Sequence, residues 1–524
     1  MAGLRQGRRL MAVLAARIFA NSYRDSVELM QIAAAIEGLE GIERAGLVMA
    51  TPANREVLAA AGLLTAEAAA AGPNDLVVAV SAADEAVAAA ALDHASARLT
   101  GGPGGEDGGG EATRTTVRTI AEAVGESSAA NLVLIATPGA YATAEAMKAL
   151  KRGLHVFLFS DNVSVEDEIE LKVLARRKGL LLMGPDCGTA ILDGVPLGFA
   201  NVVRRGNVGL AAASGTGLQQ VSSLIDRAGA GVSQAIGVGG RDLDERVGGV
   251  MMIDAIERLA ADPGTAVIVL ISKPPSASVT ARVLAAAAGA GKPVVVNFLG
   301  GDPDTVRAAG GIPAATFDEA AEIAAALALG RPMPDGSVED AGADQVATDG
   351  LADGFADGQV RIRGLYSGGS LAGEAKLVLR AELGAAEASR HEIIDLGDDE
   401  YTVGRPHPMI DPRLRNETIE ATAQDPANAV ILLDVVLGTG ANPDPAGVLV
   451  ASIRAAQATA AANGRRIVVV ASVCGTDGDP QGLAAQEATL AAAGVVLAPS
   501  NARAARIAAG IARRLAGAGV AGGA

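Results

Sequence analysis

The sequence has little of what nucleic-acid recognition requires. Only 2% of its 524 residues are aromatic and none is Trp, so it offers few rings on which unpaired bases could stack. Asp and Glu outnumber Lys and Arg, and the formal net charge is −17. A protein that neutralises a phosphate backbone needs concentrated positive charge. We therefore expect no nucleic-acid partner for this chain.

Cysteine is almost absent as well. Cys187 and Cys474 lie far apart and form no CxxC or other metal-ligand spacing, which is typical of a reducing compartment and predicts no structural zinc. No uncharged apolar run reaches the ~18 residues of a transmembrane helix. The apolar stretch after Arg9 is broken by Arg17 and lacks a convincing cleavage site, so it is a poor secretory signal. These features predict a cytoplasmic protein with no metal ion and no membrane partner.

Histidine is the third scarce residue. The chain has four histidines, and none lies between His155 and His391. Imidazole is the side chain that most often transfers protons near neutral pH. A catalytic site built only from residues between His155 and His391 therefore has to work without imidazole.

Hydrophobic residues, in contrast, make up 50% of the chain, and glycine occurs 66 times. A chain of this length exceeds a single core and predicts about three to four domains. Strand-like and helix-like patterns alternate, which predicts βαβ units, parallel sheets and a multi-domain α/β fold. The expected segments are a small α/β cap (1–100), a Gly-rich linker (101–114), an α/β domain (115–204), a first module (205–330), an acidic linker (331–359), a second module (360–517) and a tail (518–524).

An internal duplication underlies the two modules. In each, a strand runs into a small Ser/Gly loop and a helix, and further on a helix ends in Asp-Pro before an apolar strand. The first copy occupies Gly209–Leu218 and Leu259–Ile271, and the second occupies Gly364–Leu371 and Thr422–Asp434. Unpaired N–H groups and the helix dipole favour negative charge at a helix start. Two such modules with facing Gly-rich helix starts would form a clamp for an anion.

The first module has two candidate loops, each directly after a strand. The first is the predicted phosphate-binding loop, which consists of Ser214, Gly215, Thr216 and Gly217. The second is a predicted substrate-binding loop, which consists of Gly239, Gly240 and Arg241. Small residues let an anion approach the backbone, and an arginine can bind a carboxylate or phosphate with two hydrogen bonds. The alternatives are an ordinary capped turn and a bulged loop with a solvent-facing arginine.

The second module repeats this arrangement with three loops. The predicted phosphate-binding residues are Gly438, Thr439 and Gly440; the predicted substrate-binding residues are Ser367, Gly368, Gly369, Ser370, Gly475 and Thr476. All follow strands, and ligands of open α/β sheets bind at the carboxyl ends of the strands. Because three such loops occur at the carboxyl ends of strands in one sheet, a functional interpretation is favoured over ordinary turns.

A proline-rich loop between these segments provides further candidates. It runs from Val403 to Arg413 and contains Arg405, a candidate ligand of a substrate carboxylate, and His407, our candidate for proton transfer. A structural histidine held between prolines is the alternative. We interpret both cysteines as structural, because no neighbouring base is apparent that would lower the pKa of Cys187.

Taken together, these motifs resemble a known family. Gly184-Pro-Asp-Cys187, Ser214-Gly-Thr-Gly217, Gly237-Val-Gly-Gly240 and the Asp262-Pro263 helix end look like the α-subunit of succinyl-CoA synthetase. The second module resembles the carboxyl-terminal domain of the β-subunit of that enzyme. The fused order, with Tyr366-Ser-Gly-Gly-Ser and His407-Pro-Met-Ile-Asp-Pro, is similar to FdrA-type proteins, which are often labelled acyl-CoA synthetases.

The resemblance implies a fold for each segment between residues 115 and 517. It implies a truncated, Rossmann-like domain of the coenzyme-A-binding type at 115–204. It also implies two flavodoxin-like succinyl-CoA-synthetase-type ligase domains with parallel sheets, of α-type at 205–330 and of β-type at 360–517.

The chain departs from the family pattern at several points. In the family two helix starts, carried onto 214–217 and 438–440, hold a phosphoryl group on a histidine, but the stretch after Pro293–Asp302 contains none. Ser272-Lys-Pro-Pro275 replaces an expected Glu, and no nucleotide-binding domain of the ATP-grasp type is present. The chain therefore cannot capture phosphate from ATP by the family's route. The first βαβ unit of the coenzyme-A-binding domain is not recognisable either, which makes coenzyme A binding doubtful.

FdrA-type proteins are linked to allantoin catabolism and are implied to form an oxamate carbamoyltransferase with two other subunits. On this resemblance, carbamoyl phosphate is a substrate, no cofactor is required, and the partners are other subunits of a hetero-oligomer together with self-association. The first alternative is an acyl-CoA synthetase completed by a nucleotide-binding partner chain. The second alternative is a non-catalytic subunit whose loops serve only assembly.

Overall fold

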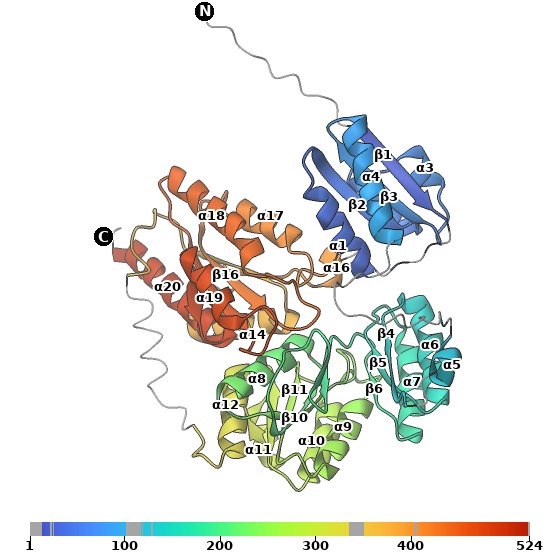
Figure 1. The fold of residues 1–524 in the computed structure, drawn as a ribbon. Helices are drawn as coiled ribbons and strands as arrows, with labels where there is room; N and C mark the ends of the chain where they lie inside the picture. Colours follow the sequence, from blue (N-terminus) through green and yellow to red (C-terminus); the bar gives the residue numbers. More distant parts are fainter. Residues whose placement is uncertain are drawn as a thin grey trace, which may run out of the picture. The chain divides into compact units, whose positions relative to one another are not determined.

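The computed structural model describes residues 13–20, 22, 24, 26–100, 117, 119–126, 129–334, 350–402 and 406–521 (Figure 1). The chain forms two compact units, one of residues 1–115 with 399–406 and the other of residues 116–398 with 407–524. None of the helices that the structure describes combines the length and the apolar character that a membrane crossing requires.

The first unit is built on a three-stranded antiparallel sheet with the order β1-β3-β2. Its strands are β1 (Val13–Phe19), β2 (Ile42–Met49) and the central, almost wholly buried β3 (Leu76–Ala82). Its helices are α1 (Ser26–Glu37), α2 (Pro52–Ala60), α3 (Ala66–Ala70), α4 (Glu85–Thr100) and α16 (Asp399–Thr402). Because side chains alternate along a strand, Val78 and Val80 pack with α1 and α4, whereas Val77 and Ala79 pack with α2 and α3.

The second unit begins with a short parallel sheet. Its three strands are β4 (Leu132–Ile135), β5 (His155–Leu158) and β6 (Leu182–Met183), in that order. The accompanying helices are α5 (Ile120–Glu126), α6 (Gly139–Lys151) and α7 (Val165–Arg177). This is the segment for which the sequence predicts a truncated Rossmann-like domain.

The first module contains a seven-stranded sheet with the order β13-β12-β11-β9-β10-β7-β8. Its parallel strands are β9 (Arg205–Ala212), β10 (Val232–Gly237), β11 (Val267–Ser272), β12 (Val294–Phe298) and β13 (Ile312–Pro313). The antiparallel hairpin of β7 (Thr189–Leu192) and β8 (Val195–Gly198) extends the sheet, so the sheet begins before residue 205. The helices are α8 (Gly215–Arg227), α9 (Val250–Ala261), α10 (Ala277–Ala288), α11 (Pro303–Ala308) and α12 (Phe317–Ala328).

The second module contains a five-stranded parallel sheet with the order β15-β14-β16-β17-β18. Its strands are β14 (Arg361–Tyr366), β15 (Glu392–Asp395), β16 (Asn428–Val436), β17 (Val468–Cys474) and β18 (Val496–Ala498). Its helices are α14 (Gly369–Leu383), α15 (Ala385–Ala388), α17 (Arg413–Thr422), α18 (Gly447–Ala462), α19 (Leu483–Ala492) and α20 (Asn501–Ala521).

The two modules share one topology. Counted from its first strand, the five-stranded sheet has the flavodoxin-like order 2-1-3-4-5, and strands β9 to β13 of the other sheet repeat that order. The predicted multi-domain α/β fold with flavodoxin-like parallel sheets is therefore confirmed. In such sheets the order reverses between the first and third strands, here β9 and β11 or β14 and β16, and ligands bind beside that point.

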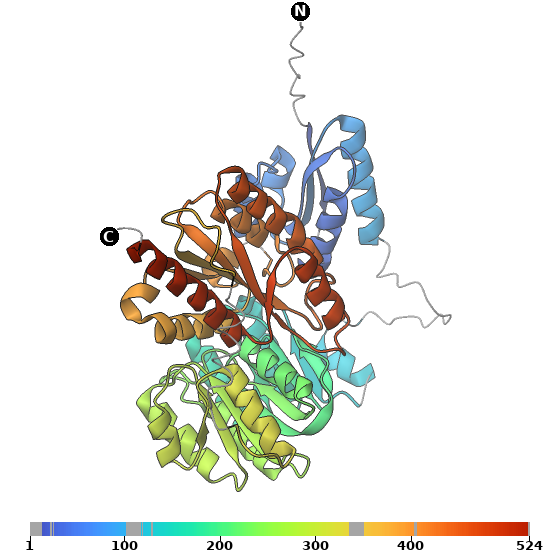
Figure 2. The same ribbon diagram turned by 90° about the vertical axis from the view of Figure 1, so that its left-hand side faces the viewer.

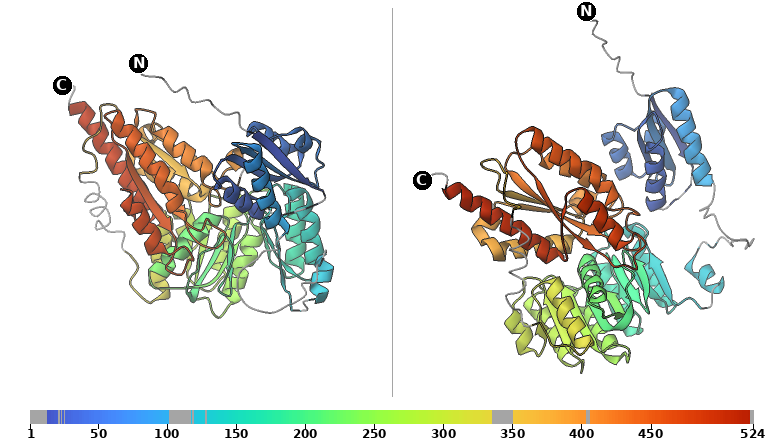
Figure 3. Two further views of the ribbon diagram at one scale, coloured as in Figure 1. Left: turned by 45° about the horizontal axis from the view of Figure 1, so that its top comes forward. Right: turned by 60° about the vertical axis from the view of Figure 1, so that its left-hand side comes forward.

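A common hydrophobic core joins the modules. Leu218 of α8 and Phe317 of α12 belong to the same buried cluster as Leu371 and Ala375 of α14. Figures 2 and 3 show residues 205–330 and 360–517 lying side by side in every view. The carboxyl ends of strands from both modules are therefore available to one site.

Candidate functional site

The start of α8 places backbone donors just after β9 of the first module. Ser214 caps the helix, and its Oγ accepts the N–H of Gly217 at 3.0 Å. A side chain at position 217 would overlap Ser214 Oγ, which explains the glycine. The first N–H groups of a helix have no intrahelical partner. Those of Gly215 and Thr216 therefore remain available to a ligand.

The start of α14 lies against the start of α8. Ser214 Oγ donates to Ser370 Oγ at 2.5 Å, so the two helix starts are joined by a direct hydrogen bond. A Cβ added to Gly368 would lie 2.9 to 3.0 Å from three atoms of Thr216. Two positive dipole ends at one place repel each other unless an anion lies between them. The structure therefore brings the predicted residues 214–217 and 367–370 together.

A buried carboxylate organises the loop before α14. Asp434 at β16 accepts the N–H groups of Ser367 and Gly368, each at 2.8 Å, and the hydroxyl of Ser367 at 3.1 Å. Arg415 pairs with Asp434 at 2.9 Å, and both side chains are buried. These donors of Ser367 and Gly368 are thus directed to Asp434. Their observed contacts fix the position of the α14 start, which leaves Gly369 and Ser370 facing α8.

Asp395, at the end of β15, is a charged group at this site that we did not single out from the sequence. Its Oδ1 accepts the N–H of Gly397 at 2.9 Å, and a Cβ on Gly369 would clash with its Oδ2. Burial raises the pKa of Asp395, and Lys273 after β11 acts in the opposite direction. The available signal for both was a polar residue where a strand ends, because β11 and β15 end at the same kind of edge as the glycine-rich loops.

His407 lies beside this cluster with a neutral ring. Burial lowers its pKa to about 4, although the negative charge of Asp434 acts in the opposite direction. Nδ1 accepts the N–H of Met409 at 3.2 Å, so the ring proton is on Nε2. Nε2 lies 2.6 Å from the position of a Cβ on Gly397, and the ring packs against Phe199 with centroids 5.8 Å apart. A neutral imidazole with this pKa is a hydrogen-bond donor and a weak base near neutral pH.

The lowered pKa of His407 makes stability depend on pH. The unfolded imidazole binds a proton below about pH 6.5, whereas the folded one does so only near pH 4. Stability is therefore lost as the pH falls through this window, by up to roughly 3 kcal/mol at pH 4. We expect His407→Gln to lose less thermal stability than the wild type when the pH falls from 7 to 4.5. A His94→Gln control, which removes an exposed imidazole, should follow the wild-type profile. Equal profiles for wild type and His407→Gln would contradict this assignment.

The loop of Gly438, Thr439 and Gly440 differs from its prediction. No helix starts there, because α18 begins at Gly447. The N–H of Thr439 donates to Ala200 O at 2.8 Å, its hydroxyl donates to Gly198 O and Ala200 O, and the N–H of Gly438 donates to Gln481. The donors of Thr439 join the second module to the end of β8 and the segment after it, whereas that of Gly438 is used within the second module. The expected helix start at 438–440 is wrong, and the second helix start of the site belongs to α14.

Gly475 and Thr476 also lie where the second module contacts the segment after β8. Thr476 Oγ1 donates to Val202 O at 2.6 Å. Asp479 accepts the N–H groups of Thr476 and Val202 at 2.8 and 2.7 Å. A side chain at Gly475 would clash with Leu437 at 2.6 Å. This loop therefore contacts the segment after β8, and its observed hydrogen bonds are structural.

The loop of Gly239, Gly240 and Arg241 follows β10, and its observed contacts are with the preceding α/β segment. Gly239 has a φ of +87° and packs against Pro185, and an added Cβ would clash with the carbonyl of that proline. Arg241 donates to Val163 O at 2.7 Å and pairs with the buried Glu168 at 3.0 Å. Among the described residues, no observed contact joins this loop to the starts of α8 and α14. Arg405 lies outside the described residues.

Both cysteines are buried. Burial raises the pKa of Cys187 to about 12 and also raises the pKa of Cys474. Thiols with such pKa values are poor nucleophiles. The structural interpretation of both residues agrees with these environments.

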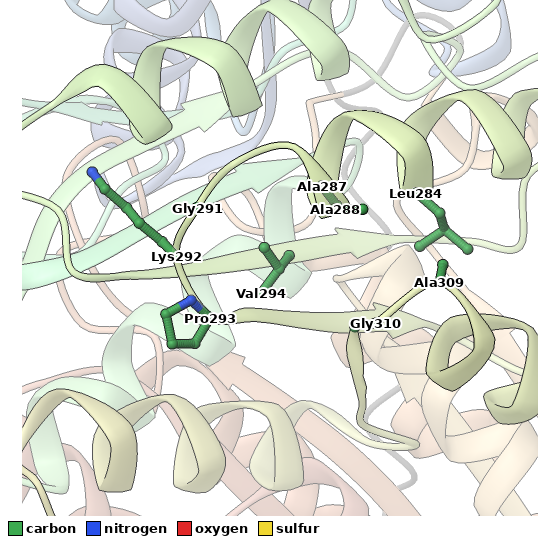
Figure 4. Close-up of a pocket in the computed structure, with 10 residues that line it drawn as sticks. Leu284, Ala287, Ala288, Gly291, Lys292, Pro293, Val294, Ala309 and Gly310 are labelled. Carbon is green, nitrogen blue, oxygen red and sulfur yellow. The ribbon is translucent and has the colours of Figure 1, made fainter.

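A cavity lies in the first module and another lies in the second. One of about 310 Å³ is lined by Lys292, Val294 and Gly310 at the amino ends of β12 and β13 (Figure 4). Lys292 donates to Leu259 O and Asp262 O and so stabilises the end of α9. This cavity is at the edge opposite the helix starts. The other, of about 10 Å³, lies beside Ser367 and is large enough for about one water.

Three family models match the chain. A model described as "AllF, heavy metal-associated domain" matches residues 11–116, a coenzyme-A-binding domain matches residues 203–301, and a CoA-ligase domain matches residues 365–511. The coenzyme-A-binding match thus covers β9 to β12, and the CoA-ligase match covers the second module. The first match includes the start of α8, and the second includes the start of α14.

The chain is also similar to curated proteins over different lengths. It is 41% identical to the uncharacterized protein YahF of Escherichia coli over 92% of this chain and 95% of that protein. It is 28% identical to a succinate–CoA ligase α-subunit of Methanothermobacter thermautotrophicus, over 34% of this chain and 60% of that subunit. The solved ATP citrate lyase of Methanothrix soehngenii shares 15% identity with a TM-score of 0.35, over 77% of this chain and 85% of that one.

The heavy-metal description implies a metal ion that residues 11–116 do not fit. They contain no cysteine, and His94 is their only histidine. A soft metal ion is typically held by cysteine thiolates, which this segment lacks. In the part of the chain that the structure describes, no group of three or more His, Cys, Asp and Glu side chains could hold a metal ion.

Proposed function

The chain belongs to the FdrA-type family of acyl-CoA synthetase-like proteins, and on that premise we propose that it transfers a carbamoyl or acyl group by way of an acyl phosphate. The preferred reaction is that of an oxamate carbamoyltransferase in allantoin catabolism, with carbamoyl phosphate as the donor. The AllF name of the N-terminal family model supports this choice of pathway.

The observation that carries the proposal is the contact between the two helix starts. Ser214 and Ser370 lie 2.5 Å apart, at the first turns of helices from two different modules. The free N–H groups of Gly215, Thr216, Gly369 and Ser370 are donors suited to phosphate oxygens. No histidine is present between His155 and His391 to carry the phosphate covalently. A site of this kind binds a phosphate group that arrives already attached to its acyl group.

The proposed transfer is reversible, and its steps are given in the direction of oxalurate phosphorolysis. A phosphate oxygen attacks the carbamoyl carbon of oxalurate, the bond from that carbon to the oxamate nitrogen breaks, and the phosphate proton passes to the nitrogen. Carbamoyl phosphate and oxamate are the products. The helix starts stabilise the phosphate charge, and the Nε2–H of the neutral His407 donates to the carbonyl oxygen as charge develops there. Arg405 lies outside the described residues and stays our sequence-based candidate for a ligand of the substrate carboxylate.

An acyl-CoA synthetase is the second candidate function. The matches to a coenzyme-A-binding domain and to a CoA-ligase domain favour it. In this case a partner chain supplies the nucleotide site, and the same helix starts hold the acyl phosphate before coenzyme A attacks it. Both candidates therefore use one phosphate site and differ in the acceptor.

Phosphorolysis of oxalurate by the chain assembled with its partner subunits tests the proposal. Carbamoyl phosphate should form from oxalurate and inorganic phosphate without ATP or coenzyme A. Turnover that requires ATP, coenzyme A and a carboxylic acid would instead establish the acyl-CoA synthetase. An assembled complex that is inactive in both assays, or that keeps full activity when His407 is replaced, would favour a subunit used only for assembly.

A further inference from the structure

Lys273 lies at the point where the strand order of the first module reverses. β11 pairs in parallel with β9, with Ile271 beside Ala212, and the N–H of Ala213 donates to Ile271 O at 2.9 Å. Lys273 directly follows β11, and Ser214 follows β9 after one intervening residue. Neighbouring strands are about 4.8 Å apart. The backbone of Lys273 therefore runs beside the phosphate-binding turn.

The ammonium group of Lys273 is available for a ligand. The side chain is exposed, and Lys273 takes part in no ion pair or hydrogen bond among the described residues. Lys292 offers a contrast within the same module, because its ammonium is used by Leu259 O and Asp262 O. A free lysine is an effective phosphate ligand because it presents a compact charge with three donors.

The charge of Lys273 reaches the second module. It acts on Asp395, whose carboxylate lies at the first residue of α14. The other charged groups around that carboxylate are Asp434, which Arg415 neutralises, and the exposed Asp398. Each helix start carries roughly half a positive charge. The two dipole ends together offset about one negative charge, and Lys273 adds one positive charge, which favours the binding of an anion.

We propose that Lys273 is a substrate-binding residue whose ammonium contacts the phosphate oxygens of a ligand held between the starts of α8 and α14. Asp395, from the facing module, attracts the ammonium toward the site when no ligand is bound. This inference rests on the proposed function, because it names a further ligand of the same phosphate site. The recognised group is a phosphate, either free or as part of an acyl phosphate.

Calorimetric titration of the full chain with inorganic phosphate, and separately with carbamoyl phosphate, tests this assignment. Lys273→Met should weaken binding of both ligands by about 10- to 100-fold, and Lys273→Arg should restore most of the affinity. The control is Lys376→Met, which removes the same charge from an exposed position on α14. This control should bind both ligands as the wild type does. The dependence of affinity on salt should also decrease in Lys273→Met alone.

The outcomes separate this inference from the proposed function. If the wild type binds phosphate and Lys273→Met binds it equally well, the role of Lys273 is overturned and the phosphate site remains. If Lys376→Met weakens binding as much as Lys273→Met, the effect is one of general charge and the assignment is also overturned. If the wild type binds neither ligand, both the inference and the proposed function are overturned.

Discussion

Gly369→Ala is expected to lower the rate of carbamoyl transfer by about 100-fold or more. A methyl group at this position would clash with Oδ2 of Asp395, whose other oxygen is held by Gly397. Either the carboxylate or the start of α14 has to move, and a displacement of about 1 Å at a reacting site can cost 100-fold in rate. Steady-state kinetics with oxalurate and phosphate measure the effect.

Gly373→Ala is the matched control in the same helix. A Cβ at Gly373 meets nothing within 4 Å. Because alanine is the better helix former, Gly373→Ala should gain about 0.5 to 1 kcal/mol of stability and keep wild-type activity. Wild-type kinetics for Gly369→Ala would show that the first residue of α14 has no part in the reaction.

Lys172→Met is expected to destabilise the protein by about 3 to 5 kcal/mol. The ammonium of Lys172 is fully buried and contacts Glu168 at 2.7 Å, Asp242 at 2.8 Å and Val238 O at 3.0 Å. Its removal leaves the buried Asp242 without its cation and leaves the buried Glu168 with Arg241 alone. For a cooperative unit of about 150 to 250 residues this corresponds to a decrease in Tm of at least about 6 °C.

Lys148→Met is the control for that measurement. Lys148 is exposed on α6 and pairs only with Glu145 within the helix, so its loss should change stability by less than about 0.5 kcal/mol. Thermal unfolding followed by circular dichroism compares the two variants. A Tm for Lys172→Met within about 1 °C of the wild type would contradict the account of this buried network.

Much of the fold could be predicted from the sequence because it follows from local patterns. The strands Val267–Ser272 and Asn428–Val436 contain the continuous apolar runs 267–271 and 429–433, which indicate strands covered on both faces, and every residue of both strands is buried. The repeated Ser/Gly loops indicated duplicated modules, and the two sheets share one strand order. The hairpin of β7 and β8 was assigned to the preceding segment, because strand pairing between distant residues leaves no local signal.

The candidate site was predictable only in part. The capped start of α8 has a local signature, since a serine followed by small residues after a strand indicates a helix start. Gly438–Thr439–Gly440 carries a similar pattern, but its donors are used by a segment more than 230 residues earlier in the chain, for example Thr439 by Gly198. Asp395 and Lys273 could not be recognised as neighbours from sequence, because they come from different modules and act on each other only after the modules pack together.

The most direct test of the central claim is the position of phosphate bound to this chain. A crystal structure of the protein with inorganic phosphate should show the ion between the N–H groups of Gly215 and Thr216 on α8 and those of Gly369 and Ser370 on α14. Phosphate bound elsewhere, with the starts of α8 and α14 still in contact through Ser214 and Ser370, would contradict the claim that these two helices bind the reacting anion.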